Sequence, residues 1–125
     1  MNTALANQAV VDELVSPLET QNKSWEAIDI ADISKLEAGD IIRMQTSPGN
    51  IYLLEVAFPA TRLAHIYRHE KRGYAMQGYR GARIIVFLKV GRMMLYTASD
   101  NPEDATDIRK LHRTSVVKNI HLLHA

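Results

Sequence analysis

The feature that most constrains the fold is a set of short segments in which apolar and polar residues alternate. Each of these segments ends at turn residues. In segment 51–56 the even-numbered residues are all apolar and share one face of a strand, with Glu55 on the opposite face. Segment 41–45 forms a second strand, and the Ser-Pro-Gly-Asn sequence at 47–50 supplies a hairpin turn between the two. Before them, residues 36–40 predict a tight turn, because Gly39 can take a positive φ and Asp40 can accept bonds from nearby amides.

Further strands are expected along the rest of the chain. Segment 84–90 is apolar on both faces, which predicts a central strand buried from two sides. Residues 98–107 predict a polar loop with a turn at Asn101-Pro102, before a closing strand over 114–123. Less regular patterns predict strands over 63–68 (where 60–69 also tolerates a helical turn), 74–79 and 92–97.

The first residues follow a different pattern. Apolar residues at helical spacing predict a helix over 3–15, with Asn2 or Thr3 as its cap and Pro17 beyond its end. Residues 16–24 are polar and read as a linker. We therefore expect an N-terminal helix and linker over 1–24 and a mainly β domain over 25–125, a small barrel or sandwich of about six short strands.

Composition limits the class of protein. The 125 residues suit one domain, and the lack of cysteine excludes disulfides and thiolate metal sites and fits a reducing compartment. The longest apolar run, Ile84 to Leu88, is far below the roughly 20 residues of a membrane-spanning helix. No secretion signal is apparent, so a soluble cytoplasmic protein without membrane contact is expected.

Three motifs carry a resemblance. Leu36-x-x-Gly39-Asp40-x-Ile42, then Tyr52-x-Leu54-Glu55-Val56 and Thr114-Ser115-x-Val117-x-x-Ile120, occur in that order. This arrangement resembles small bacterial β-barrel proteins that have a GD-hydrophobic strand, a YxLEV strand and a final TSxVxxI strand. The resemblance implies a fold and no established activity, and it leaves out the N-terminal helix and the central basic segment.

The net charge of +1 is a cancellation of two unlike regions. Residues 1–40 contain eight acids against two lysines, which gives −6, and residues 62–93 contain eight bases against one acid, which gives +7. Such asymmetry indicates interaction surfaces. The acidic region could lie across the basic one within a chain, or could pair with it between two copies as a homodimer.

The basic region also contains tyrosines and glycines. Cations neutralise phosphates and aromatic rings stack on unpaired bases, so segment 62–83 is a candidate site for single-stranded nucleic acid. An acidic protein surface is the other candidate partner, and a solvated face that complements the acidic region is the simpler explanation. The candidate site residues are Arg68, Lys71, Arg72, Tyr74, Tyr79, Arg80 and Arg83.

Alternative functions rest on single residues. Glu55 is the one carboxylate within an apolar strand, and burial could make it an acid or base, although pairing with Arg43 or Arg83 is the commoner explanation. His65 and His69 lack the His-Glu-x-x-His order, and no catalytic residue, metal site or cofactor is predicted. The preferred hypothesis is a non-catalytic binding module. The alternatives are a protein-interaction or self-assembly domain, whose contact could include one of the opposite-facing Met93 and Met94, and an enzyme centred on Glu55 or a histidine.

Overall fold

A computed structural model describes residues 4–47, 49–69 and 78–125. One α-helix, α1 (Gln8–Val15), precedes seven strands. The strands are β1 (Glu26–Ile28), β2 (Ile41–Thr46), β3 (Ile51–Phe58), β4 (Leu63–His69), β5 (Gly78–Phe87), β6 (Met93–Thr97) and β7 (Leu111–Leu123). Short 3₁₀ helices occupy η1 (Ala4–Ala6), η2 (Leu18–Thr20), η3 (Ile33–Lys35), η4 (Pro59–Thr61), η5 (Pro102–Thr106) and η6 (Ile108–Lys110).

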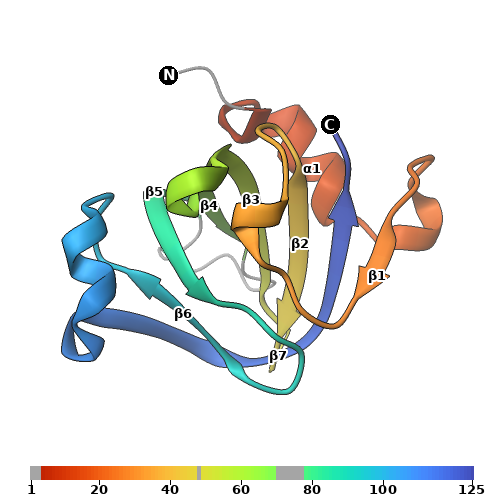
Figure 1. Ribbon diagram of the computed structural model, residues 1–125. Coiled ribbons are helices and arrows are strands. Elements are labelled where there is room, and N and C mark those ends of the chain that lie inside the picture. Colours follow the sequence, from red (N-terminus) through yellow and green to blue (C-terminus); the bar gives the residue numbers. More distant parts are fainter. Residues whose placement is uncertain (1–3, 48, 70–77) are drawn as a thin grey trace.

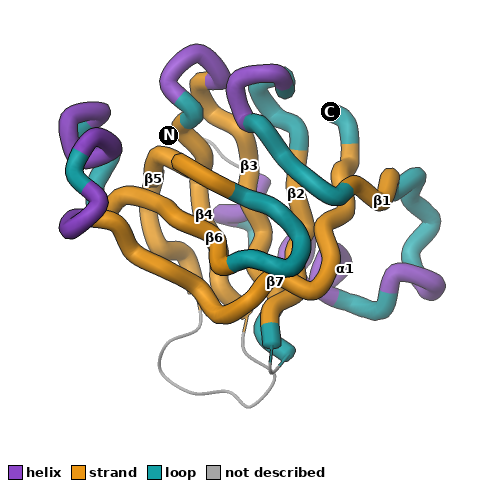
Figure 2. The backbone as a smooth tube through the Cα atoms, turned by 60° about the horizontal axis from the view of Figure 1, so that its bottom comes forward, coloured by secondary structure: helices purple, strands orange, loops and turns teal. Residues whose placement is uncertain are grey.

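The strands form one antiparallel sheet that closes on itself (Figures 1 and 2). From β2 to β7 each strand pairs with the next, and β7 also pairs with β2. The long β7 changes neighbours along its length, since Leu111 to Val116 pair with β6 and Ile120 to Leu122 pair with β1. The expectation of a mainly β fold with a short N-terminal helix is confirmed.

Alternation along the strands separates the two faces of the sheet. Tyr52, Leu54 and Val56 all lie in the main buried cluster inside the barrel, as predicted from their spacing. Met94 belongs to the same cluster, whereas Met93 faces outward, so the expected opposition of these two methionines is also confirmed.

A second buried cluster lies on the outer face of β2, β3 and β4. Val11 and Leu14 of α1 pack there against Ile41, Leu53 and Tyr67. The outer face of these strands also carries apolar side chains, which must be shielded from water. The amphipathic α1 covers them (Figure 1). The helix therefore shares a core with the barrel.

The helix begins later than the sequence suggested. The side chain of Asn7 accepts hydrogen bonds from the backbone N–H groups of Ala9 and Val10, at 3.0 and 3.4 Å. Asn7 is thus the N-cap, and the prediction of a cap at Asn2 or Thr3 is wrong. Ala4 to Ala6 form the separate η1 turn instead.

The turn before β2 has the predicted chemistry. Gly39 has a φ of +93°, and Asp40 accepts a bond from the backbone N–H of Glu37 at 2.9 Å. The other oxygen of Asp40 accepts the backbone N–H of Ala125 at 2.9 Å, which ties this turn to the residues that follow β7.

Two strand predictions need correction. Segment 63–68 is the strand β4, so the helical alternative over 60–69 is wrong apart from the η4 turn at Pro59–Thr61. The strand predicted over 84–90 is the end of β5, which stops at Phe87 after a register shift between Ile85 and Phe87. Ile84 and Ile85 are buried, but Phe87 is exposed, so burial from two sides does not extend along the segment. The strand start predicted at Tyr74 lies outside the described residues.

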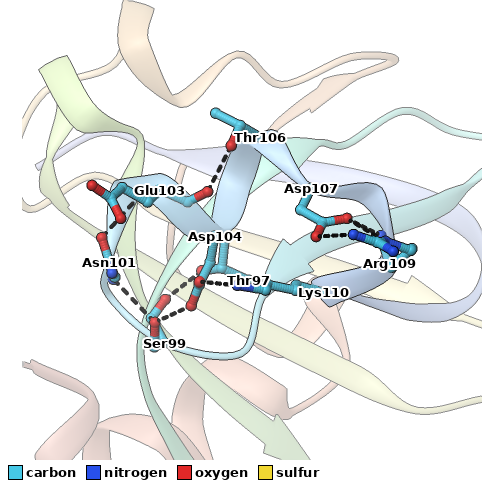
Figure 3. Close-up of polar contacts among 9 residues, drawn as sticks. All are labelled: Thr97, Ser99, Asn101, Glu103, Asp104, Thr106, Asp107, Arg109 and Lys110. Carbon is cyan, nitrogen blue, oxygen red and sulfur yellow. Dashed lines mark hydrogen bonds and ion pairs between the residues drawn. The ribbon is translucent and has the colours of Figure 1, made fainter.

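The polar segment between β6 and β7 folds into η5 and η6 (Figure 3). Asn101 and Asp107 cap these turns by accepting the backbone N–H groups of Glu103 and Arg109, each at 3.0 Å. Asp104 accepts a bond from the hydroxyl of Ser99 at 2.6 Å and lies 3.8 Å from the ammonium of Lys110. These side chains hold the connection in place, so we assign it a structural role.

Among the described residues, no helix combines the length and apolar character that crossing a lipid bilayer requires.

Replacement of Leu14 by alanine tests whether α1 is part of the core. We expect Leu14→Ala to lower the free energy of unfolding by about 2–5 kcal/mol, because the side chain is fully buried against the sheet. Urea denaturation followed by circular dichroism measures this change. Asp12→Ala, on the exposed side of the same helix, should stay within about 0.5 kcal/mol of the unchanged protein. Equal effects of the two substitutions would show that α1 does not stabilise the barrel.

Candidate functional site

The described members of the basic segment do not gather on one face. Arg68 follows the inward-facing Ile66 by two residues, and its guanidinium lies 5.7 Å from the centre of the Tyr52 ring. Tyr79 faces outward opposite Tyr67, because the two are register partners on β4 and β5. Lys71, Arg72 and Tyr74 lie outside the described residues.

The remaining described candidates are Arg80 and Arg83, and the side chain of Arg83 contacts the backbone carbonyl of Arg80. The guanidinium of Arg83 donates to the backbone carbonyls of Arg80, Thr97 and Ala98, at 2.9, 3.3 and 2.6 Å. These bonds join β5 to the end of β6. Arg83 therefore has a structural role in this fold, and its guanidinium is turned toward the protein backbone.

The acidic N-terminal region lies beside the basic one at residues 29–31, where the backbone N–H of Ala31 donates to the carbonyl of Leu88 and that of Val90 donates to the carbonyl of Asp29, at 3.0 and 2.8 Å. Asp32 and Arg62 form an ion pair between these two regions, at 3.8 Å and partly exposed to solvent. Exposed pairs of this kind contribute about 0–1 kcal/mol. Glu13 pairs instead with Lys23, within the acidic region itself.

An apolar strip crosses the outer face of β5, β6 and β7. Register partners share a face of a sheet, and here Phe87 pairs with Leu95 and Met93 pairs with Val116. Ile30 extends the strip, because it lines the same hollow of about 180 Å³ as Phe87. Four of these side chains are 38–58% exposed, while Leu95 is half-buried. We call Ile30, Phe87, Met93, Leu95 and Val116 the apolar strip.

Cations border this strip. Arg113 is the register partner of Leu95, Lys89 bridges to Ile30, and Arg92 precedes Met93 in the chain. All three side chains are exposed. We call Lys89, Arg92 and Arg113 the basic rim. The sequence did not reveal this site, because the apolar run over 84–90 predicted a buried strand. The signals that could have found it were the opposite-facing Met93 and Met94.

A second candidate site surrounds Glu55 on the outer face of β3. The register partners of Glu55 are Ile41 and His65, and the predicted pairing with Arg43 or Arg83 is wrong for the described structure. His65 is buried, and its Nδ1 lies 2.8 Å from the hydroxyl of Tyr79. Burial raises the pKa of Tyr79, the charge of Arg83 opposes this rise, and the charge of Glu55 adds to it.

An open cleft of about 390 Å³ lies beside this cluster. Glu55 and His65 both line it, together with Phe58 and small or aliphatic residues of β3 and of the turn before β2. An enzyme centred on Glu55 or a histidine needs a cavity beside that residue, and this cleft is one. The other lining residues, however, offer neither a nucleophile nor a second charge.

The buried Arg43 and the half-buried His121 form a basic pair on neighbouring strands. They are register partners on β2 and β7, and the Nε of Arg43 and the Nδ1 of His121 lack a hydrogen-bond partner among the described residues. Burial lowers the pKa of His121, and the charge of Arg43 lowers it further. Neither residue lines the cleft beside Glu55, and the charge of Glu19 in η2 partly offsets the effect of burial on the pKa of Arg43.

The pH dependence of stability tests this pair. Because the pKa of His121 is lowered in the folded state, the unfolded chain binds more protons below the ordinary histidine pKa, near 6.5. The free energy of unfolding should therefore fall as the pH drops below about 6.5, and level off below the lowered pKa. His121→Gln should reduce this fall, and Arg43→Met should reduce it less, since burial is the larger cause. Urea denaturation across this pH range measures the slopes, and an unchanged slope in His121→Gln would contradict the assignment.

Comparison of the chain with protein-family models, curated proteins and solved structures finds no match. A fold of this kind does not by itself specify a function. The surfaces that bear on function are the apolar strip, its basic rim and the cleft beside Glu55.

Proposed function

We propose that this protein is a non-catalytic binding module that docks an acidic protein segment on the apolar strip. The observation that carries the proposal is the contiguity of exposed apolar side chains on β5, β6 and β7, with the basic rim beside them and the Asp32–Arg62 pair at the hollow. Exposed apolar patches of this kind are typical of interaction sites. The rim favours a partner of negative charge, because complementary charges guide association and select the partner.

The hollow at one end of the strip supports the same proposal. It lies between Ile30 and Phe87, and its lining includes the buried Ile33, Ile85 and Leu88. An apolar side chain of a partner could enter it, and such anchors in pockets supply much of the affinity of protein interfaces. The strip favours a peptide over a nucleic acid, because Phe87 is its single aromatic member and bases stack on aromatic rings.

Fluorescence anisotropy with a synthetic peptide of alternating glutamate and leucine tests the proposal. We expect the peptide to bind, and Met93→Ser to weaken binding about tenfold by removing apolar contact. Arg113→Glu should weaken binding and reduce its salt dependence, since it reverses a rim charge. Arg109→Glu reverses a charge outside the strip, on η6, and should leave affinity almost unchanged.

Three outcomes would contradict this proposal. A matched peptide of alternating lysine and leucine could bind equally well, which would remove the role of the rim. A single-stranded oligonucleotide could bind at the strip more tightly than the acidic peptide. Sedimentation velocity could show a homodimer that Met93→Ser dissociates, which would assign the strip to a second copy of the chain.

A second candidate function is the binding of single-stranded nucleic acid through segment 62–83. It is favoured by the excess of bases in this segment, where Arg62, Arg68, Lys71, Arg72, Arg80 and Arg83 stand against the single acid Glu70. Since Arg83 bonds to backbone carbonyls, the phosphate contacts are assigned to the remaining basic candidates, with stacking on Tyr74 and Tyr79.

Salt-dependent titration tests the second candidate. If Lys71 and Arg72 contact phosphates, the double substitution Lys71→Gln, Arg72→Gln should weaken binding of a single-stranded oligonucleotide. It should also lower the slope of log affinity against log salt by about 0.7 for each phosphate that is no longer neutralised. The pair Arg109→Gln, Lys110→Gln on η6 is the matched control. Absent binding at low salt, or equal slopes for both double variants, would contradict this function.

A further inference from the structure

Glu55 holds a carboxylate with one buried oxygen that is unsatisfied within the described structure. The first oxygen, Oε1, accepts the backbone N–H of Ala4 at 3.3 Å. The other, Oε2, is buried and has no hydrogen-bond partner among the described residues. Because Oε2 is enclosed by protein atoms, a ligand in the cleft would meet the carboxylate through Oε1, which keeps acceptor capacity beside its bond to Ala4.

The charge of Glu55 is not balanced by an ion pair within the described part of the chain. None of the ion pairs between described residues includes Glu55, and its two register partners are Ile41 and His65. A partly buried carboxylate without a cation is costly, because the surroundings screen its charge less than water does. The site therefore attracts positive charge.

The cleft beside Glu55 limits the kind of cation that fits. Apart from Glu55 and His65, the lining residues are Ala38, Gly39, Val56, Ala57 and Phe58. The Phe58 ring is exposed, and an aromatic face attracts both alkyl groups and ammonium groups. A hydrated metal ion would find few ligands here, and the described residues contain no group of three His, Cys, Asp or Glu side chains that could hold one.

We propose that this cleft binds an organic cation with a primary ammonium group and a short apolar body. The ammonium donates to Oε1 of Glu55, and the apolar body packs against Phe58 and Ala57. His65 forms the polar wall, and its ring orientation is held by the 2.8 Å contact with the Tyr79 hydroxyl. This site lies on β3, β4 and the turn before β2, and it is independent of the apolar strip.

Three probes of nearly equal size and different charge test this proposal. n-Butylammonium, n-butanol and butyrate are titrated separately into the ¹⁵N-labelled full chain at neutral pH, and amide chemical shifts are recorded. We expect n-butylammonium to shift the amides of Glu55, Phe58 and His65, with an affinity about tenfold above that of butanol. Butyrate should leave these amides unshifted. Because the comparison uses the unchanged protein, it does not depend on whether a variant folds.

Two variants assign the charge preference to Glu55. In Glu55→Gln the affinity for n-butylammonium should fall to that for butanol, while the binding of butanol stays the same. Glu103→Gln makes the same substitution at an exposed position on η5 and should keep the preference. Equal binding of the three probes, no shift with any of them, or a preference that survives in Glu55→Gln would each overturn the proposal.

Discussion

Closure of the sheet through β7 is the constraint on which the rest of the structure depends. The first part of β7 pairs with β6 and the second part pairs with β2, so one strand joins both ends of the meander. Closure removes most free strand edges and gives the sheet an inner and an outer face. The inner face fills with the main core, whereas each part of the outer face must be covered or exposed to solvent.

The inner face could be predicted from the sequence because it follows a local rule. Residues two apart on a strand point the same way, so the spacing of Tyr52, Leu54 and Val56 predicted the core and placed Glu55 outside. The turn at Gly39 followed from similarly local chemistry, since it needs a positive φ. Such features depend on neighbours in the sequence.

The outer face could not be predicted in this way. Leu53 and Phe87 are both large apolar residues that face outward, yet α1 covers Leu53 while Phe87 remains exposed. Which apolar residues are covered depends on where a distant helix packs. The contact of His65 with Tyr79 likewise depends on the register between β4 and β5, which shifts between Ile66 and Tyr67. No short stretch of the sequence specifies helix packing or strand register. The sequence therefore indicated Glu55 as a single residue, without the cleft and His65 beside it.

Apolar contacts, and not attraction between opposite charges, hold the acidic helix α1 on the sheet. Its contacts with the sheet are apolar, through Val11 and Leu14, and its acids Asp12 and Glu13 lie on the exposed side. An acidic region held by apolar contacts does not need to neutralise a basic one. The two regions nevertheless meet away from α1, where Ile30 bridges to Lys89 and Asp32 pairs with Arg62. Lys89, Arg92 and Arg113 are exposed at the rim of the apolar strip, on a part of the sheet outside the cluster that α1 covers.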